Sequence, residues 1–477
     1  MILETLTSIL GIKNIITDKQ DMSAYLEDWR GNHKGDAQAI LLPTSTEMVS
    51  EIMRLADTHD LYIVPQGGNT GLVGGGIPDD TGRMFVLSLA RMKAIRSLSV
   101  ENHAMVVEAG CILQDLHEAA DQHDLYFPLN LAAKGSCSIG GNLSTNAGGI
   151  NVLRYGNTRD LCLGIEVVLM GGRVMNLLTS LRKDNTGYDL KHLFIGGEGT
   201  LGIITAASLK LFPKPKARAT AMASIPNPQT GVALLGALKQ ATGDLVEAFE
   251  IMPRDIFNVV AKQFPSLTCP IQPVPEMCIL MEIASSDEAL GTVSEDGTVP
   301  LVEKLNTFLA QEFETGRVLD AVVAQNETQR QAMWDIREHA PDSTKRESWP
   351  VNTDISVSLS DIGRFYEDAS RRAKEIDPEV RICGYGHLGD GNIHFNLIER
   401  EGGDSGWAQK RGAMFDAVYE ALYACNGSIS AEHGIGTMKA EQLKLVKDPV
   451  ALEAMHAIKQ VFDPKGLLNP GKILSKD

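Results

Sequence analysis

The chain has 477 residues and a mass of 51.6 kDa, and its 44 Lys and Arg against 61 Asp and Glu give a formal net charge of −17. This length predicts two or three domains, and 43% apolar with 22% charged residues is typical of a globular chain and argues against disorder. The acidic balance argues against nucleic acid or anionic lipid as a general partner.

No apolar run is long enough to span a bilayer, and the N-terminus lacks the basic region and cleavage site of a secretory signal. A cytoplasmic protein without a transmembrane segment, at most peripherally associated with a membrane, is therefore expected. None of the 7 cysteines has CxxC spacing, which predicts buried thiols and not a disulfide framework, a Cys₄ zinc site or an iron–sulfur cluster.

The first half of the chain alternates short strands and helices. One amphipathic helix and a loop are expected before residue 37, then a strand at 39–43, a helix from 44–47 to 60 with Thr44 or Ser45 as its cap, and a strand at 61–65, which form a small α/β layer. Further strands are predicted at 84–89, 104–110, 163–175 and 203–212, with a helix at 112–123.

The Pro-Lys-Pro-Lys of 213–216 has the composition of an interdomain linker, and the pattern changes after it. Helices near 228–241, 300–315 and 326–339 and strands near 277–284, 318–324 and 353–359 predict an α+β domain in the second half.

Three glycine-rich loops occupy 65–76, 135–149 and 185–202. Glycine permits positive φ and close backbone approach, so successive N–H groups can point into one concavity and bind phosphate oxygens. One such loop is more often a tight turn, but three together favour a cofactor that carries phosphate. Matches to G-x-G-x-x-G at 197–202 and 384–389 run into predicted strands instead of helices, which argues against NAD.

A hairpin in the second half brings two histidines together. Asp390-Gly391 predicts a type I′ turn, which would pair His387 with His394 on one face of a sheet, and Tyr385 with Asn396 next to them. Two neighbouring imidazoles suit a divalent metal, and the alternative is a hydrogen-bonded polar cluster without metal.

A third metal ligand is available in the segment 430–437. Glu432 and His433 point opposite ways in an extended chain, so one can bind metal while the other has a different role. Two histidines, one glutamate and an open position are typical of catalytic zinc, and manganese or iron(II) is compatible.

The sequences PQGGNTGLVGG, GSCSIGGNLSTNAGG and NTGYDLKHLFIGGEGTLGIIT and the closing FDPKGLLNPGK resemble the vanillyl-alcohol oxidase/p-cresol methylhydroxylase superfamily over nearly the whole chain. They are most similar to its D-2-hydroxyacid dehydrogenases, which include D-lactate and D-2-hydroxyglutarate dehydrogenases. The resemblance implies an FAD held by these loops. Asn69 stands where members with covalent FAD carry histidine, so the FAD is expected to be non-covalent. The cofactor-binding residues that it implies are Pro65, Gly67, Gly68, Asn69, Thr70, Gly71, Gly74, Gly135, Ser136, Ser138, Gly140, Gly141, Asn142, Thr145, Asn146, Gly148, Gly149, Glu198, Gly199, Gly202 and Ile203.

The resemblance also implies an α+β fold. A two-part FAD-binding domain at 1–215 would combine the small α/β layer with a larger, antiparallel-rich α+β part. An α+β substrate-binding cap domain with the metal hairpin would follow at 216–425, and a C-terminal segment at 426–477 would return to the FAD domain.

The motifs GHxGDGNxH and EHGIG of metal-dependent members recur here, so the resemblance makes His387, His394 and Glu432 the metal ligands and His433 the catalytic base. Arg337 would bind the substrate carboxylate through its bidentate guanidinium, although a surface arginine paired with Glu338 or Asp335 is the alternative. Asn352 and Asn396 are the other expected substrate-binding residues.

The chain departs from the D-2-hydroxyglutarate pattern at two positions. That pattern has a threonine four residues after the arginine and a lysine fifteen after it, where this chain has Pro341 and Asn352. Loss of the lysine removes a charge-assisted contact worth about 1.5–3 kcal/mol. Asn352-Thr353-Asp354 is more similar to the D-lactate-type members, and Lys345 or Arg346 is an alternative partner for a distal carboxylate.

The expected function is oxidation of a small anionic D-2-hydroxyacid, D-lactate or a compound like D-2-hydroxyglutarate, to the 2-oxoacid. It would use FAD and a divalent metal, Zn²⁺ first and Mn²⁺ or Fe²⁺ as alternatives, and pass electrons to an external quinone, cytochrome or electron-transfer flavoprotein. The alternatives are an O₂-using flavin oxidase of an alcohol or sugar, a non-catalytic flavin-binding subunit of a larger complex, and a metal-dependent hydrolase. A homodimer is compatible with the sequence.

Overall fold

The computed structural model describes residues 2–295, 297–403 and 406–475, which form two compact units. Unit 1 consists of Met1–Gly149, Gly156–Pro213 and Glu432–Asp477, and unit 2 of Ile150–Tyr155 and Lys214–Ala431. Residue 1, which begins the first expected domain range, and residues 476 and 477, at the end of the last one, lie outside the described residues. Within the described ranges, no helix combines the length and the apolar character needed to cross a bilayer.

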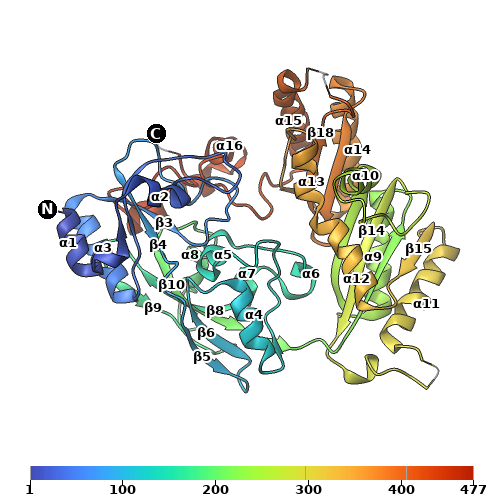
Figure 1. Cartoon of the computed structure of the whole chain (residues 1–477), viewed down its shortest axis with the longest axis horizontal. Coiled ribbons are helices and arrows are strands. Elements are labelled where there is room, and N and C mark those ends of the chain that lie inside the picture. The colour runs from blue at the N-terminus through green and yellow to red at the C-terminus, as the bar shows by residue number, and fades with distance from the viewer. Residues whose placement is uncertain (1, 296, 404–405, 476–477) are drawn as a thin grey trace. The chain divides into compact units, whose positions relative to one another are not determined.

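Unit 1 contains a small α/β layer (Figure 1). Its four-stranded sheet has the order β1-β2-β4-β3, in which β2, β4 and β3 are parallel. The elements are α1 (Ile2–Leu10), β1 (Ile15–Ile16), α2 (Lys19–Leu26), β2 (Ala37–Leu41), α3 (Thr46–His59), β3 (Tyr62–Gln66) and β4 (Met84–Ser88). Ser45 caps α3 by accepting from the Met48 N–H, which confirms one of the two expected caps. The single helix expected before β2 is wrong, because Gly11, at φ 78°, separates α1 from the next elements.

A larger antiparallel sheet forms the second part of unit 1, with the order β5-β6-β10-β8-β9. Its strands are β5 (Ile95–Ser99), β6 (Ala104–Glu108), β8 (Cys162–Val168), β9 (Val174–Asn176) and β10 (Ile203–Lys210). The one strand expected at 163–175 is a hairpin, because Gly171 and Gly172 turn the chain at positive φ. The described helices and short strands around it are α4 (Leu113–Asp121), β7 (Leu125–Tyr126), α5 (Ile139–Thr145), α7 (Thr158–Leu161), α8 (Lys191–Phe194), β11 (Phe212–Pro213), α16 (Ala440–Val446) and α17 (Pro449–Phe462).

The C-terminal segment completes the core of the small layer. Leu468 pairs with Ile63 of β3, and Leu467 and Leu468 are buried with the apolar residues of α1, α3 and β2. The small α/β layer beside a larger antiparallel sheet confirms the expected α+β class.

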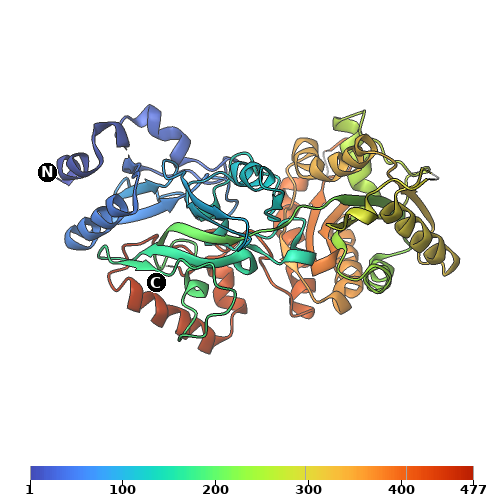
Figure 2. The same cartoon turned by 90° about the horizontal axis from the view of Figure 1, so that it is seen from below.

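Unit 2 is built on a seven-stranded antiparallel sheet with the order β15-β12-β14-β13-β17-β18-β16. Helices cover both of its faces, as Figure 2 shows. The strands are β12 (Ala217–Ser224), β13 (Val246–Pro253), β14 (Met277–Ser285), β15 (Asp320–Val323), β16 (Ile355–Ser356), β17 (Arg381–His387) and β18 (Asn392–Ile398). The helices are α6 (Val152–Tyr155), α9 (Pro228–Thr242), α10 (Arg254–Gln263), α11 (Pro300–Glu314), α12 (Glu327–Glu338), α13 (Ala340–Glu347), α14 (Ile362–Ile376) and α15 (Trp407–Ala424).

One face of this sheet carries the polar residues that matter below. Directly paired residues share a face, and Glu250 of β13 is paired with His387 of β17. Helices α10, α12 and α13 pack on the same face through an apolar cluster that includes Trp334, Ile336 and Tyr385. The face therefore combines an apolar core with ionisable groups at its centre.

Candidate active site

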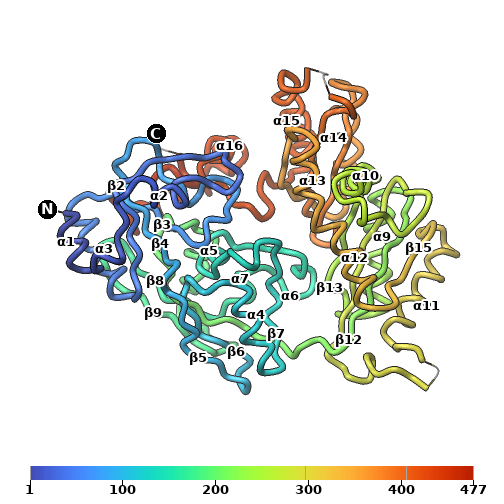
Figure 3. Tube along the Cα trace, in the orientation of Figure 1, coloured from blue at the N-terminus to red at the C-terminus, as the bar shows by residue number. Residues whose placement is uncertain are grey.

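A cavity of about 320 Å³ lies in unit 1, enclosed by the glycine-rich loops. Figure 3 traces the long segments that follow β3 and β9 and carry two of these loops, and the segment after β9 includes α8. Of the residues expected to bind the cofactor, all except Gly135, Ser136, Asn146 and Gly149 line the cavity. The wall also includes Val73, which lies in the first loop but was not singled out, and residues 131–133, which carry no motif that sequence reasoning could have used.

The first and second loops are in van der Waals contact, and two glycines make this possible. A Cβ on Gly68 would lie 2.1 Å from the Ser136 carbonyl oxygen, and one on Gly67 would lie 2.4 Å from Ser138 Oγ. Gly68 is therefore required by the close approach of two backbones, and Gly67 leaves room for the Ser138 hydroxyl.

Replacement Gly68→Ala is expected to lower the free energy of unfolding of the flavin-free protein by about 1–3 kcal/mol, because the new methyl group overlaps backbone that cannot move aside easily. Gly71→Ala in the same loop is the matched control, since no described atom lies within 4 Å of the place that its methyl group would occupy. Urea unfolding of both variants measures the difference. Equal midpoints for the two would contradict this packing argument.

The chemistry of the wall fits an FAD. The side-chain oxygen of Asn142 is buried at the cavity and has no hydrogen-bond partner among the residues that the structure describes. A buried acceptor without a partner costs free energy, and an isoalloxazine ring or a ribityl chain brings the N–H and O–H donors that would satisfy it.

Glu198 of the third loop forms hydrogen bonds with the backbone of the turn that follows His433. Its carboxylate accepts from the backbone N–H groups of Ile435 at 2.7 Å and Gly436 at 2.8 Å. Burial raises the pKa of the Glu198 carboxyl, and the two N–H groups oppose that shift. Glu198 lines the cavity as expected, but its carboxylate oxygens serve the protein backbone.

This turn holds the two residues of the EHGIG motif at the cavity. Glu432 and His433 both line it, and Glu432 Oε1 accepts from the Gly149 N–H at 2.6 Å. Gly436 must be glycine, because a Cβ would lie 2.1 Å from the Val73 carbonyl oxygen. The expected base therefore lies in the wall of the expected flavin site.

The histidine hairpin of unit 2 forms, but its expected register is wrong. Tyr385, and not His387, is paired with His394, because the connection is a four-residue segment, 388–391, that includes a 3₁₀ turn. A shift of two residues keeps every side chain on its face. His387 and His394 therefore still lie side by side, with ring centroids 5.8 Å apart.

A carboxylate stands behind each of the two imidazoles. His387 Nδ1 lies 2.6 Å from Glu250 Oε1, and His394 Nδ1 lies 3.9 Å from Asp354 Oδ1. Glu250 on β13, His387 on β17, His394 on β18 and Asp354, which directly precedes β16, thus form a row of carboxylate, imidazole, imidazole and carboxylate. Only the Glu250 carboxylate is within hydrogen-bond distance, and it selects the His387 tautomer with its lone pair on Nε2, which is the arrangement that metal-binding histidines adopt.

Arg337 points inward and does not form the surface pair with Glu338 or Asp335 that was the alternative. Its side chain is 9% exposed, its Nε donates to Glu250 Oε2 at 2.6 Å, and its guanidinium lies 4.9 Å over the Tyr385 ring. Burial alone would raise the pKa of the Glu250 carboxyl, but the charges of His387 and Arg337 hold that pKa at about 2.

The other expected substrate residues are less central. Asn396 is buried, and its side-chain oxygen accepts from the Thr353 N–H at 3.1 Å, whereas Asn352 is exposed. Of the two candidates for a distal carboxylate, Lys345 is exposed and Arg346 is paired with Asp342 at 2.8 Å. These positions stay predictions.

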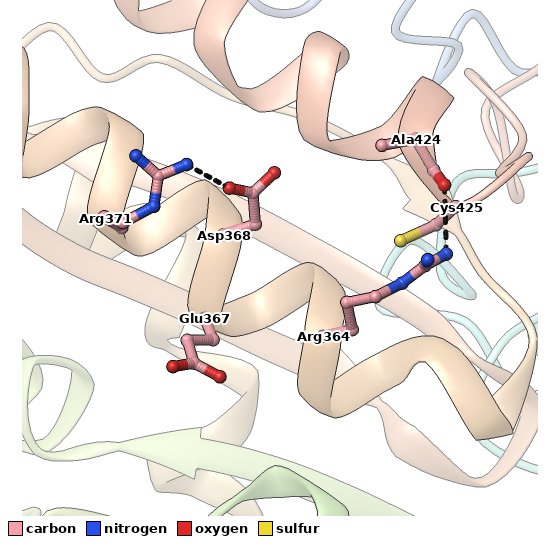
Figure 4. Close-up of a pocket in the computed structure, with 6 residues that line it drawn as sticks. All are labelled: Arg364, Glu367, Asp368, Arg371, Ala424 and Cys425. Atoms are coloured by element: carbon pink, nitrogen blue, oxygen red, sulfur yellow. Dashed lines mark hydrogen bonds and ion pairs between the residues drawn. The ribbon is translucent and has the colours of Figure 1, made fainter.

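Figure 4 shows a second cavity, of about 290 Å³, between α14 and the end of α15. Its lining is Arg364, Glu367, Asp368, Arg371, Ala424 and Cys425. Arg364 donates to the Ala424 carbonyl at 2.9 Å and Arg371 to Asp368. With two arginines and two acids the lining has no net charge, so it offers no basis for selecting an ionic ligand.

Comparison with protein families gives two matches. A profile described as "FAD linked oxidases, C-terminal domain" matches residues 214–473, and one described as "FAD binding domain" matches residues 37–178.

Relatives with curated names resemble the chain over nearly its whole length. A protein of Arabidopsis thaliana named "D-2-hydroxyglutarate dehydrogenase, mitochondrial" is 38% identical over 98% of this chain and 80% of its own. A D-2-hydroxyglutarate–pyruvate transhydrogenase of Saccharomyces cerevisiae is 34% identical over 98% of this chain and 93% of its own. Because several relatives are named mitochondrial, the cytoplasmic location stays a prediction.

A solved structure of p-cresol methylhydroxylase has the same fold, with a TM-score of 0.76, 15% identity, and coverage of 100% of this chain and 97% of its own. The match to an FAD binding domain agrees with the glycine-rich loops and the cavity described above. The chain belongs to the FAD-linked oxidases and, among them, to the D-2-hydroxyacid dehydrogenases, which makes it an FAD-linked oxidoreductase.

Proposed function

We propose that the protein oxidises a D-2-hydroxyacid to the 2-oxoacid, with D-2-hydroxyglutarate as the first candidate because that is the substrate in the names of its relatives. The observation that carries this proposal is the inward guanidinium of Arg337 beside the His387–His394 pair. A cation for a carboxylate and donors for a metal thus lie on one face of one sheet. The substitution of the expected lysine by Asn352 keeps D-lactate as the second candidate.

The FAD would be held, without a covalent bond, by the loops that line the cavity of unit 1, where it supplies the acceptor for the hydride of the substrate. The first loop would contribute backbone N–H groups, and the second would contribute Ser138 and Asn142, which line the cavity. The electrons would then pass to an external carrier, a quinone, a cytochrome or an electron-transfer flavoprotein.

A divalent metal, Zn²⁺ first, would be held by His387, His394 and Glu432, where it lowers the pKa of the substrate hydroxyl. Chain connectivity supports Glu432 as the third ligand. Ala431, the last residue of unit 2, donates its N–H to the Asp354 carbonyl at 3.4 Å, and the Asp354 side chain lies behind His394. The next residue along the backbone is Glu432.

The protein side chains then have distinct tasks. Arg337 would bind the substrate carboxylate and so orient the Cα–H bond. His433, in the wall of the cavity, would accept the hydroxyl proton at an imidazole nitrogen as the hydride leaves. The loops around them would exclude water from the reacting atoms.

The purified protein is expected to reduce an artificial dye under anaerobic conditions with one or more of D-2-hydroxyglutarate, D-lactate, D-malate and glycolate. The L-enantiomers of the three chiral acids, 2-hydroxyglutarate, lactate and malate, are the control, and they should give no more than background reduction. Reaction with none of the acids would contradict the proposed function and favour a non-catalytic subunit. Stoichiometric peroxide in air would instead indicate the oxidase alternative.

Removal of metal by a chelator is expected to abolish dye reduction while the flavin stays bound, because two of the three proposed ligands, His387 and His394, lie in unit 2 and do not line the flavin cavity. Readdition of Zn²⁺, Mn²⁺ or Fe²⁺ to parallel samples should restore activity with one of them. Full activity in a sample shown by elemental analysis to hold no metal would remove the metal from the proposal.

A further inference from the structure

Glu250 connects two groups that the proposed reaction uses separately. One carboxylate oxygen lies 2.6 Å from His387 Nδ1, and the other accepts from Arg337 Nε, also at 2.6 Å. The Glu250 side chain is 1% exposed, so water does not compete for either oxygen. Each of its oxygens is therefore committed to one partner.

The backbone around Glu250 is held by strand pairing on both sides, which constrains where its carboxylate lies. It stands in the middle of β13, a strand that is buried throughout and is paired with β14 on one side and β17 on the other. Its two partners come from different elements, His387 from the end of β17 and Arg337 from the last turn of α12. Glu250 thus sets the distance between an imidazole of the sheet and a guanidinium of the covering helix.

A second buried glutamate shows what a purely structural contact of this kind looks like. Glu282 of β14, on the same face, accepts from Arg330 of α12 at 2.7 and 2.9 Å and from Trp334 Nε1 at 2.9 Å. Arg330 stands two helical turns before Arg337. Both glutamates therefore bind an arginine of α12 and connect this helix to the sheet. Only Glu250 also contacts a histidine that is a proposed metal ligand.

We propose that Glu250 is a positioning residue that sets the metal-binding imidazole of His387 and the carboxylate-binding guanidinium of Arg337 at one fixed separation. The inference rests on the proposed function. In a 2-hydroxyacid the hydroxyl and the carboxylate are on adjacent carbons, so a metal at the hydroxyl and an arginine at the carboxylate must keep a constant spacing. One carboxylate shared by both groups supplies it.

Because His387 and Arg337 share the Glu250 carboxylate, a Glu250 variant is expected to lose both metal affinity and carboxylate affinity. A variant of either partner alone would lose only one of them. Glu250→Gln leaves one acceptor for two donors, so His387 and Arg337 compete for it and each is held for part of the time. Metal affinity is expected to fall about 10- to 100-fold, as is typical when the group behind a metal-binding histidine is lost. Affinity for a carboxylate ligand is expected to fall at least tenfold in the same variant.

Two binding measurements without turnover test this on the flavin-loaded protein. The first is the dissociation constant of Zn²⁺, from competition with a chromogenic chelator. The second is the dissociation constant of oxalate for the metal-free protein, from the perturbation of flavin absorbance. His387→Gln should weaken only the first and Arg337→Lys only the second, whereas Glu250→Gln should weaken both.

Glu282→Gln is the matched control, because it weakens the neighbouring contacts between the sheet and α12. It should change neither the Zn²⁺ nor the oxalate dissociation constant. If Glu250→Gln does not fold, Glu250→Asp keeps the charge but is one methylene too short to reach both partners, and it should show the same double loss. Wild-type protein that binds no Zn²⁺ would overturn the proposed metal site together with this inference. Normal binding by the wild type, with a loss of one constant or of neither in the Glu250 variants, would overturn the inference alone.

Discussion

Replacement His433→Asn is expected to slow flavin reduction by a D-2-hydroxyacid about 10²- to 10⁴-fold, while flavin and metal contents stay at wild-type levels. Asparagine keeps the polarity of the side chain but cannot accept a proton at neutral pH. The loss should therefore appear in the rate of the chemical step and not in substrate binding. Anaerobic stopped-flow measurement of flavin bleaching at saturating substrate gives this rate directly.

His456→Asn provides the control for this experiment, because His456 is exposed on α17 and lines neither described cavity. It should reduce its flavin at the wild-type rate. Near-normal bleaching in the His433→Asn protein would remove this residue from the role of base. A fall in flavin content would show instead that the EHGIG turn shapes the cofactor site, through the contacts of Glu198 with Ile435 and Gly436.

The parts of this site that the sequence predicted are those with local signals. Glycines that must approach another backbone, such as Gly68, occur in runs that can be recognised without the fold. The two histidines flank a short turn, so their proximity follows from hairpin geometry even though the pairing was shifted by two residues. A shift of one residue would have placed His394 on the opposite face, and the prediction of a shared site would have failed.

The parts that sequence reasoning missed depend on contacts between distant segments. Glu250 is 137 residues away from His387, and no motif surrounds it. The one signal was the segment VEAFEIMP, in which acidic residues interrupt an apolar run typical of a buried strand. A buried acid requires a partner, but the sequence does not say which one, and β13 itself was not predicted.

The same limit applies to Glu198. Its place beside glycines predicted a cofactor contact, whereas its carboxylate holds backbone N–H groups more than two hundred residues further along the chain. Local sequence therefore identified the loop correctly and could not identify the partner of its charged residue.

Replacement Arg337→Lys is expected to lower kcat/KM for the D-2-hydroxyacid about 10- to 100-fold, because an ammonium cannot make the bidentate contact of a guanidinium and a lost charge-assisted hydrogen bond costs about 1.5–3 kcal/mol. Arg337→Met should lower kcat/KM further and should also lower the free energy of unfolding. It leaves Glu250 buried with only the His387 imidazole as a partner, and breaking a buried pair from one side costs about 3–5 kcal/mol of unfolding free energy.

Arg330→Lys separates the two effects, since Arg330 lies on the same helix and is paired with Glu282, away from the proposed substrate. It should destabilise the protein in urea while kcat/KM stays within about twofold of wild type. If Arg330→Lys and Arg337→Lys lowered kcat/KM equally, the arginine would act only by holding α12 against the sheet. A loss confined to Arg337→Lys, in a protein that unfolds at the same urea concentration as Arg330→Lys, would require the guanidinium itself to contact the substrate.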